Sequence, residues 1–251
     1  MSGEDCVRIP APPRFSIVIP IHNEAECLAR EVDALITELA AHSVDYELIL
    51  AENGSTDETP AIAEQLAAAQ PRVRFLHVPR PDYGAAMKAG MLAGSGSLLV
   101  NFDIDFRDVG FMLRAGRRIE RGGPAIVVGS KIMQGAEDTR PVVRRLVSLG
   151  FTTILRVLFD RRMDDTHGVK VLRKDVIDRF APQTVMTRDL FDTELIIRAR
   201  RAGVVVEAIP VACEEKRKSR SSLGRRIPRT LRGLVRLRLI LWKEGDVRAR
   251  P

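Results

Sequence analysis

Short apolar runs alternate with amphipathic segments along the first 100 residues. The runs are rich in aliphatic and β-branched residues, which suit buried strands. They cover residues 15–20, 46–51, 73–78 and 98–100. The segments between them carry apolar residues at helical spacing, as at Leu28, Val32, Leu35 and Leu39. Strands that alternate with helices in this way predict a mostly parallel central sheet with helices on both faces.

The same alternation continues less regularly in the second half of the chain. We expect strands at 125–128 and 204–209, a loop and strand over 164–172, and helices at 142–159 and 192–201. No internal repeat or low-complexity tract interrupts the chain. The pattern therefore predicts an irregular lead-in over residues 1–14, one α/β domain over 15–222, and a helix with a tail over 223–251.

Polar segments follow three of the predicted strands at their carboxyl ends. They cover residues 20–24, 52–57 and 103–105. Ligands of open α/β sheets bind at this edge. Asp103 and Asp105 are spaced so that both carboxylates can converge on one cation, and carboxylate oxygens suit Mg²⁺ or Mn²⁺. The spacing therefore predicts a site for a metal ion and a diphosphate after the fourth strand.

The sequence lacks the signatures of several other classes. No Gly-X-Gly-X-X-Gly follows the first strand, and no Gly-X4-Gly-Lys-Ser/Thr occurs, which argues against a dinucleotide dehydrogenase and a P-loop NTPase. No run of about 18 apolar residues and no signal-like N-terminus is present. The three cysteines are far apart and lack metal-ligand spacing. We therefore expect a cytoplasmic protein without a transmembrane segment.

Basic residues are concentrated at the C-terminus. The net charge is +7, and residues 214–251 hold 13 Lys or Arg against 4 Asp or Glu. If a helix starts at Pro228, most of its basic residues gather on one side, and Leu234, Leu241 and Trp242 gather on the other, where Arg238 also lies. Such a basic amphipathic helix favours peripheral binding to an anionic membrane surface through residues 225–243. The alternative is a helix docked on its own domain.

Four segments, taken in order, resemble the inverting glycosyltransferases of family 2, which have the GT-A fold. They are residues 16–24, the Glu-Asn-Gly-Ser-Thr-Asp of 52–57, residues 84–90, and the Asp-Ile-Asp of 103–105. The likeness extends over about residues 15–222. Glu52 and Asn53 stand where the family usually has two aspartates, and Arg107 stands where related mannosyltransferases often have a glutamine.

The resemblance implies roles for individual residues. The implied donor-binding residues are Pro20, His22, Asn23, Glu24, Glu52, Asn53, Gly84, Lys88, Asp103, Ile104, Lys131 and Arg217. The implied ligands of Mg²⁺ or Mn²⁺ are Asp103 and Asp105. The implied catalytic residues are Asp105, Asp164 and Glu194. Asn23 and Asp57 are also suited to capping the helices that follow them.

The second half most resembles the polyprenyl-phosphate glycosyltransferases, among them the dolichyl-phosphate glucosyltransferases. The segments that carry this likeness are 129–131, 164–170, 191–195 and 217–222. They imply an enzyme at the inner face of a membrane that moves a hexose from UDP-glucose or GDP-mannose to a polyprenyl phosphate. The nucleotide, the hexose and the oligomeric state stay open.

Two other functions compete with this interpretation. The same fold can act on a hydroxyl of a soluble sugar or glycolipid. In that case Glu194 would be needed as a general base, whereas a phosphate acceptor is already anionic and needs none. A more remote alternative is a non-catalytic nucleic-acid-binding protein. The basic tail has few aromatic residues, which argues against single-strand recognition, so we expect no nucleic-acid partner.

Overall fold

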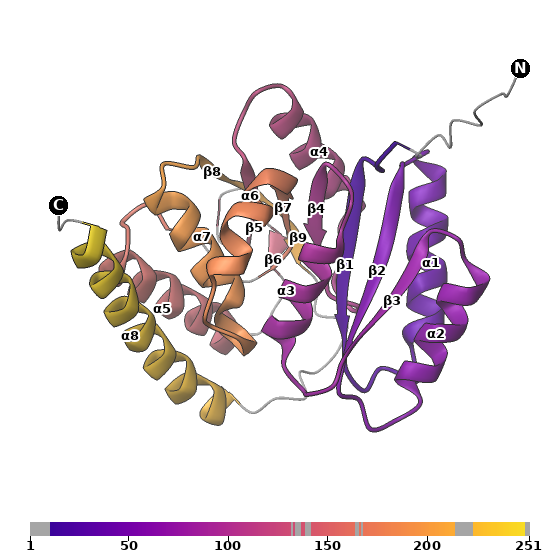
Figure 1. Ribbon diagram of the computed structural model, residues 1–251, viewed down its shortest axis with the longest axis horizontal. Coiled ribbons are helices and arrows are strands. Elements are labelled where there is room, and N and C mark those ends of the chain that lie inside the picture. Colours follow the sequence, from indigo (N-terminus) through magenta and orange to yellow (C-terminus); the bar gives the residue numbers. More distant parts are fainter. Residues whose placement is uncertain are drawn as a thin grey trace, which may run out of the picture.

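The computed structural model describes residues 11–131, 133, 137–138, 142–163, 166, 168–213 and 223–248. The strands of its main sheet are β1 (Phe15–Ile21), β2 (Tyr46–Asn53), β3 (Val73–Val78), β4 (Leu98–Asn101), β5 (Ile126–Ser130), β7 (Lys170–Arg173) and β8 (Val206–Pro210). They lie in the order β3-β2-β1-β4-β7-β5-β8 (Figure 1). Two short strands, β6 (Glu137–Asp138) and β9 (Ala212–Cys213), pair separately.

The main sheet is parallel except at β7, which runs antiparallel to both β4 and β5. This confirms the predicted mostly parallel α/β sheet. Strands β1 and β2 are buried along their whole length, which explains why their sequences are continuous apolar runs. The chain enters β1 from the upper side in Figure 1, so the carboxyl ends of the parallel strands lie along the lower edge of the sheet.

Helices cover both faces of the sheet. They are α1 (Leu28–Ala41), α2 (Thr59–Ala69), α3 (Tyr83–Ala93), α4 (Val109–Glu120), α5 (Val142–Leu158), α6 (Lys174–Phe180), α7 (Phe191–Arg201) and α8 (Leu223–Arg248), with short 3₁₀ turns η1 (Ala181–Gln183) and η2 (Arg188–Leu190). Apolar residues of α1, α2 and α4 pack on one face, and those of α3, α6 and α7 pack on the other. The core therefore consists of two apolar layers with the sheet between them.

Two local expectations differ from the structure, and a third agrees with it. No element was predicted over residues 109–120, which form α4 with the Asp108 carboxylate accepting from Phe111 N at its start (2.6 Å). Asn23 does not cap α1, because a turn intervenes and the helix begins at Leu28. Asp57 does accept from Thr59 N (3.0 Å), the first residue of α2, as its predicted capping role requires.

Helix α8 has one face on the domain and one in solvent. It begins at Leu223 and continues through Pro228, so this proline lies inside the helix and not at its start. Leu234, Leu237 and Leu241 are buried against the second apolar layer. The exposed apolar residues of this helix are Ile227, Leu231, Val235, Leu239 and Trp242. Within the described ranges, no helix has both the length and the apolar character needed to cross a membrane.

Candidate active site

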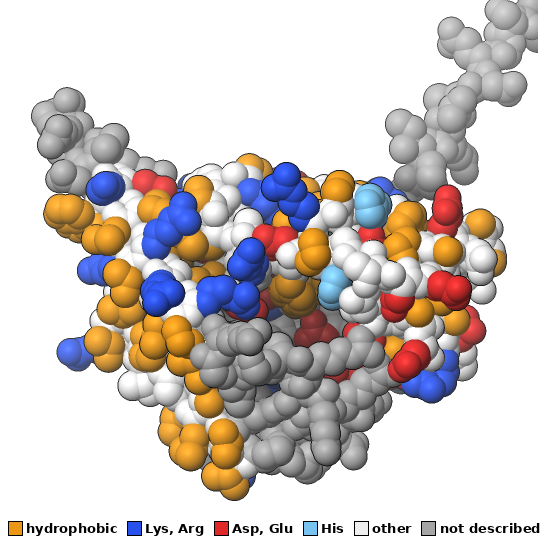
Figure 2. All heavy atoms as spheres, turned by 90° about the horizontal axis from the view of Figure 1, so that it is seen from below, with side chains coloured by type: hydrophobic (Ala, Val, Ile, Leu, Met, Phe, Trp, Pro, Cys, Tyr) orange, Lys and Arg blue, Asp and Glu red, His pale blue; other side chains and the backbone are white. Residues whose placement is uncertain are grey.

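The loops after β1 and β2 are joined by hydrogen bonds at the carboxyl edge of the sheet. His22 Nδ1 lies 2.8 Å from Asn53 O, and Asn23 N donates to Ser55 Oγ (3.0 Å). The Asn23 side chain accepts from Thr56 N (2.8 Å), and Asn23 itself has a φ of 56°. This contact explains why Asn23 is not a cap: its amide oxygen is used across the two loops. Figure 2 views this edge and shows acidic and histidine side chains around a hollow.

Gly54 brings the loop after β3 into the same group. It has a φ of 62°, and a Cβ built on it would lie 2.7 Å from Pro81 N and 2.9 Å from Arg80 C. Any other residue would therefore be strained and would also push the β3–α3 loop away. The glycine of the Glu-Asn-Gly-Ser-Thr-Asp segment thus has a structural reason, because it lets three loops meet at one edge.

Glu52 and Asn53 lie inside this group of loops. The Glu52 side chain is 0% exposed. Its Oε1 accepts from Ser55 N (2.5 Å), and its Oε2 lies 2.5 Å from Nδ1 of His77. Asn53 Nδ2 donates to Ile21 O (2.9 Å). Both predicted donor residues are at the expected edge, but their side chains are engaged with the protein itself.

The Asp-Ile-Asp segment forms a tight turn after β4 and is not part of the strand. Asp103 N donates to Phe106 O (3.1 Å), and Phe106 N donates to Asp103 O (3.2 Å). Tyr83 Oη, from α3, donates to Asp103 Oδ1 (3.1 Å). Asp103 is partly buried and Asp105 is exposed. The turn therefore offers one anchored carboxylate and one that is open to solvent.

The two carboxylates fit a hard divalent ion that keeps other ligands. Burial, and then the nearby charge of Asp105, raise the pKa of Asp103, so a cation would relieve the repulsion between them. Among the described residues, no group of three or more His, Cys, Asp and Glu side chains is arranged to hold a metal. Asp103 and Asp105 would thus share a Mg²⁺ or Mn²⁺ ion with diphosphate oxygens and water.

A buried ion pair lies beside the acidic turn. Lys170 Nζ donates to Asp192 Oδ2 (2.8 Å) and to Gly168 O (2.8 Å), and Asn101 Nδ2 also donates to Asp192 Oδ2 (3.3 Å). Lys170 is 1% exposed and Asp192 is 5% exposed. Asp192 Oδ1 has no hydrogen-bond partner within the part of the chain that the structure describes. Burial, then Asp103 and Asp192, raise the pKa of Tyr83 well above its usual range, so both carboxylates lie near this hydroxyl.

Sequence reasoning did not single out Tyr83 or Asn101. Asn101 carried a usable signal, since it is a polar residue in an apolar strand two positions before Asp103. Tyr83 carried none, because its contact with Asp103 joins α3 to a turn 20 residues further along the chain. Lys131, which was predicted, lies near the turn with its Nζ 5.2 Å from the centre of the Phe106 ring.

Three predicted residues make contacts that serve the fold. Glu194 is 0% exposed, and its carboxylate accepts from Val185 N (2.9 Å), Met186 N (2.6 Å) and Arg198 Nε (2.7 Å). These bonds use both oxygens and do not favour the base role expected for Glu194. Lys88 Nζ donates to Thr184 O (2.9 Å), and a Cβ on Gly84 would lie 2.5 Å from Arg188 N.

The remaining predicted residues fall into two groups. Pro20 and Ile104 are buried, and Glu24 N donates to Thr59 Oγ1 (2.7 Å) across the first two loops. Arg107, at the position where related mannosyltransferases often have a glutamine, donates from Nη1 to Glu31 Oε2 of α1 (2.7 Å). Asp164 and Arg217 lie outside the described residues.

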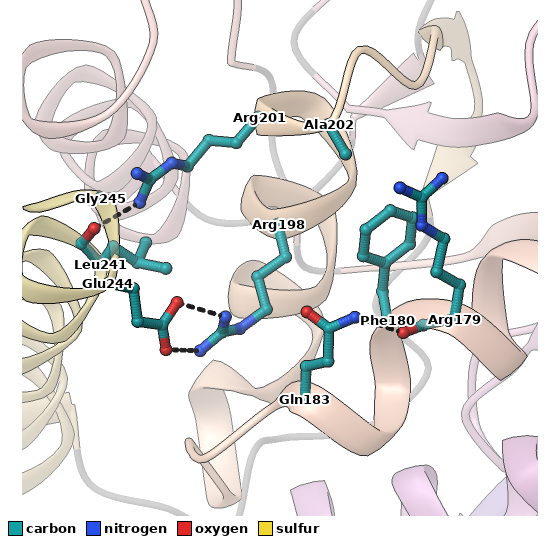
Figure 3. Close-up of a pocket in the computed structure, with 9 residues that line it drawn as sticks. All are labelled: Arg179, Phe180, Gln183, Arg198, Arg201, Ala202, Leu241, Glu244 and Gly245. Atoms are coloured by element: carbon teal, nitrogen blue, oxygen red, sulfur yellow. Dashed lines mark hydrogen bonds and ion pairs between the residues drawn. The ribbon is translucent and has the colours of Figure 1, made fainter. Parts of the chain in front are cut away.

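A cavity of about 150 Å³ lies elsewhere, between α6, α7 and α8 (Figure 3). None of the predicted site residues lines it. Arg198 Nη1 and Nη2 bond to the Glu244 carboxylate (2.7 and 2.9 Å), and Arg201 Nη1 donates to Leu241 O (2.9 Å). These contacts attach α8 to α7, so this cavity belongs to the packing of the C-terminal helix.

Known sequences place the chain among glycosyltransferases. Residues 16–180 match the model of Glycosyl transferase family 2. The glycosyltransferase AglD of Haloferax volcanii is 30% identical over 217 residues, which are 84% of this chain and 35% of AglD. Dolichyl-phosphate beta-glucosyltransferase ALG5C of Trichomonas vaginalis is 28% identical over 231 residues, covering 83% of this chain and 68% of that protein. The chain therefore spans about a third of the length of AglD and two thirds of ALG5C.

Solved structures with the same fold include one complex with a nucleoside diphosphate and one with a sugar nucleotide. Glucosyl-3-phosphoglycerate synthase from Mycobacterium tuberculosis, in complex with UDP, has a TM-score of 0.66 at 21% identity and covers 90% of this chain and 80% of that one. Mannosyltransferase PcManGT from Pyrobaculum calidifontis, in complex with GDP-Man and Mn²⁺, has a TM-score of 0.58 at 17% identity, covering 87% and 61%. These likenesses confirm the predicted GT-A fold.

Proposed function

The chain belongs to glycosyl transferase family 2, and from this premise we propose that it transfers a hexose from UDP-glucose or GDP-mannose to a polyprenyl phosphate at the cytosolic face of a membrane. The observation that carries the proposal is the acidic turn. Asp103 and Asp105 stand at the carboxyl edge of the sheet, next to Tyr83 and the Lys170–Asp192 pair. Membership of an enzyme family sets aside the non-catalytic nucleic-acid binder.

The donor diphosphate would lie against the acidic turn. Asp103 and Asp105 would hold Mg²⁺ or Mn²⁺, and when bound this ion offsets the negative charge that builds on the leaving diphosphate. Tyr83 fixes the orientation of Asp103 through its hydroxyl (3.1 Å). Lys131 lies close enough to Asp103 for its positive charge to lower the pKa of that carboxyl. It is therefore suited to bind a diphosphate oxygen at the same site. We retain Arg217 as a donor-binding residue and Asp164 as a catalytic residue in this proposal, on the resemblance alone.

The acceptor would attack the anomeric carbon from the face opposite the diphosphate, which gives inversion. A phosphate monoester is anionic near neutral pH, so it needs no general base. The enzyme's contribution is then the relative placement of donor and acceptor. Glu194, whose oxygens accept three hydrogen bonds inside the fold, holds the start of α7 in this proposal and takes no part in proton transfer.

Two helices supply a surface suited to an anionic membrane. On α8, Val235, Leu239 and Trp242 are 55%, 53% and 62% exposed. On α5, Val143 and Leu146 are 62% and 61% exposed. Figure 2 shows hydrophobic side chains mixed with Lys and Arg on the side where these helices lie. Apolar side chains that enter the interface, with arginines that meet lipid phosphates, would bring the site to its lipid acceptor.

Vesicle binding tests this surface. Leu239→Ser combined with Trp242→Ala should weaken binding to anionic vesicles at least about tenfold, because two interfacial side chains are lost. Val205→Ser is a matched control, since Val205 is 65% exposed but lies outside both helices. Equal binding by the double variant and the control would contradict a membrane role for α8.

A direct assay tests the reaction. Purified protein with Mn²⁺ is given UDP-glucose or GDP-mannose and vesicles that contain a polyprenyl phosphate, and the transferred hexose is recovered in the lipid fraction. Transfer with one donor, with inverted configuration, is expected. Nucleotide release with a soluble sugar or glycolipid, and none with the polyprenyl phosphate, would replace the lipid acceptor with a hydroxyl.

One observation favours a hydroxyl acceptor as the second candidate. Asp192 is buried near Tyr83, as is Asp103, and its Oδ1 has no partner in the described ranges, so this oxygen is left to accept a hydrogen bond from an acceptor hydroxyl. With a hydroxyl acceptor, Asp192→Asn should lower kcat by about 10²- to 10⁴-fold. With a phosphate acceptor, the same variant should stay within about tenfold of the wild type.

A further inference from the structure

Glu52 and His77 are paired positions at the carboxyl ends of β2 and β3. In this register their side chains lie on the same face of the sheet, and His77 Nδ1 is 2.5 Å from Glu52 Oε2. The Glu52 side chain is 0% exposed, whereas that of His77 is 51% exposed. The histidine therefore stands between a buried carboxylate and the surface of the site.

The carboxylate fixes the tautomer of a neutral histidine ring. An ionised carboxylate can only accept hydrogen bonds, so the proton in this contact must be on Nδ1 of His77. Glu52 is held in turn by Ser55 N, which donates to Oε1 (2.5 Å). A neutral imidazole with its proton on Nδ1 has a lone pair on Nε2. Glu52 therefore presents His77 to its surroundings as a hydrogen-bond acceptor.

We propose that Nε2 of His77 accepts a hydrogen bond from the ring N–H of the donor's base and so selects uracil or guanine. Uracil N3 and guanine N1 carry a hydrogen, whereas cytosine N3 and adenine N1 carry a lone pair. An acceptor at this position favours the first two bases and repels the other two. The inference rests on the nucleotide-sugar site proposed above and assigns its base recognition to one side chain.

The distance between His77 and the acidic turn at 103–105 matches the length of the ligand. Between β3 and β4 lie β2 and β1, so the end of β3 is three inter-strand steps, roughly 14 Å, from the end of β4 and its acidic turn. This is comparable to the length of an extended nucleoside diphosphate. Gly54 also draws the β3–α3 loop onto the β2–α2 loop. A base at His77 and a diphosphate at Asp103 therefore fit one continuous ligand.

Calorimetric titration with UDP and N3-methyl-UDP, in the presence of Mn²⁺, tests the assignment. The methyl group removes the N3 hydrogen and leaves the rest of the nucleotide unchanged. The wild type should bind UDP at least about tenfold more tightly than the methylated form. His77→Phe should bring the two affinities within about twofold. His42→Phe, an exposed histidine at the end of α1, should keep the full difference. GDP and N1-methyl-GDP provide the same pair if guanine is the base.

Glu52→Gln provides a second variant that retains the histidine. A glutamine has one oxygen and one NH₂ group, and its oxygen must face Ser55 N. Its NH₂ group then donates to His77 Nδ1, which moves the ring proton to Nε2 and removes the acceptor. This variant should also lose the preference for unmethylated nucleotide.

The outcomes separate the inference from the proposed function. Binding of UDP or GDP with an undiminished methyl effect in His77→Phe would overturn the role of His77 and leave the donor site intact. Equal affinity of the wild type for methylated and unmethylated nucleotide would do the same. Absence of binding to either nucleotide would overturn both.

Discussion

Strand β2 carries two buried glutamates, one near its amino end and one near its carboxyl end. Glu47, near the amino end, accepts from Ser16 Oγ (2.6 Å), Ser95 N (2.5 Å), Ser95 Oγ (2.7 Å) and Arg74 Nη1 (2.6 Å). Within the described residues, Glu52, near the carboxyl end, bonds only to Ser55 N and to the half-exposed His77. Glu47 therefore bonds to other strands and loops of the fold. Glu52 instead bonds to a histidine that is half exposed at the surface.

The difference follows from the polarity of a parallel sheet. Ligands of open α/β sheets bind beyond the carboxyl ends of the strands, so acidic side chains at that edge can contact a ligand. Acids at the amino edge meet only the ends of other elements and are satisfied by the protein. Burial alone would raise the pKa of Glu47, but the hydrogen bonds from Ser16, Ser95 and Arg74 outweigh it and lower the pKa to about 2. The four predictions below test this contrast.

The largest effect is expected at the acidic turn of the carboxyl edge. Asp105→Asn should lower kcat by about 10³-fold, or about 4 kcal/mol, because it removes one of the two charges that we propose hold the metal. Asp105 is exposed, so the melting temperature without ligand should change by less than about 2 °C. A kcat close to that of the wild type would contradict the placement of the active site at this turn.

Glu47→Gln should show the opposite behaviour at the amino edge. Its unfolding free energy should fall by about 3 kcal/mol, because the amide cannot accept at both ends and the Ser95 and Arg74 donors lose their charged partner. Nucleotide affinity should be unchanged. Urea denaturation measures the free energy of unfolding, and calorimetric titration measures the nucleotide affinity. A loss of affinity without a loss of stability would contradict a structural role for Glu47.

Acid titration sharpens the same point. The pKa of Glu47 is lowered from 4.5 to about 2 in the folded protein, so its stabilisation is present above pH 4.5 and is lost as the pH falls towards 2. Between pH 6 and pH 3 this group should lose about 2 kcal/mol of stability. Other acids titrate in this range as well. The difference between the wild type and Glu47→Gln isolates Glu47, and parallel stability curves for the two proteins would refute its role.

The smallest effect is expected for Glu52→Gln. The same substitution on the same strand should weaken binding of the matching nucleoside diphosphate by about tenfold, or about 1.4 kcal/mol. It should lower the free energy of unfolding less than Glu47→Gln does. Within the described residues the Glu52 carboxylate makes two hydrogen bonds, whereas that of Glu47 makes four. A denaturation midpoint below that of Glu47→Gln would show that the two carboxylates serve the fold alike.

Sequence patterns were sufficient where the periodicity is strong. The runs at 15–20 and 46–51 became β1 and β2 with small extensions, and the expected helix at 142–159 is α5. Helix α4 was not predicted, although Asp108 caps its start and its apolar positions follow directly on the Asp-Ile-Asp segment. Proline often marks a helix start, but α8 begins at Leu223 and tolerates Pro228 in its interior.

The amino-acid sequence by itself determined the α/β class, the order of the segments and the position of the acidic turn, because these depend on local periodicity and on short motifs. Only the tertiary structure decided which polar residues meet. It turned Glu194 and Lys88 towards backbone groups, joined Tyr83 to Asp103, and set His77 over Glu52. Such contacts arise from strand order and register, which bring residues far apart in the chain together, and no local pattern encodes them.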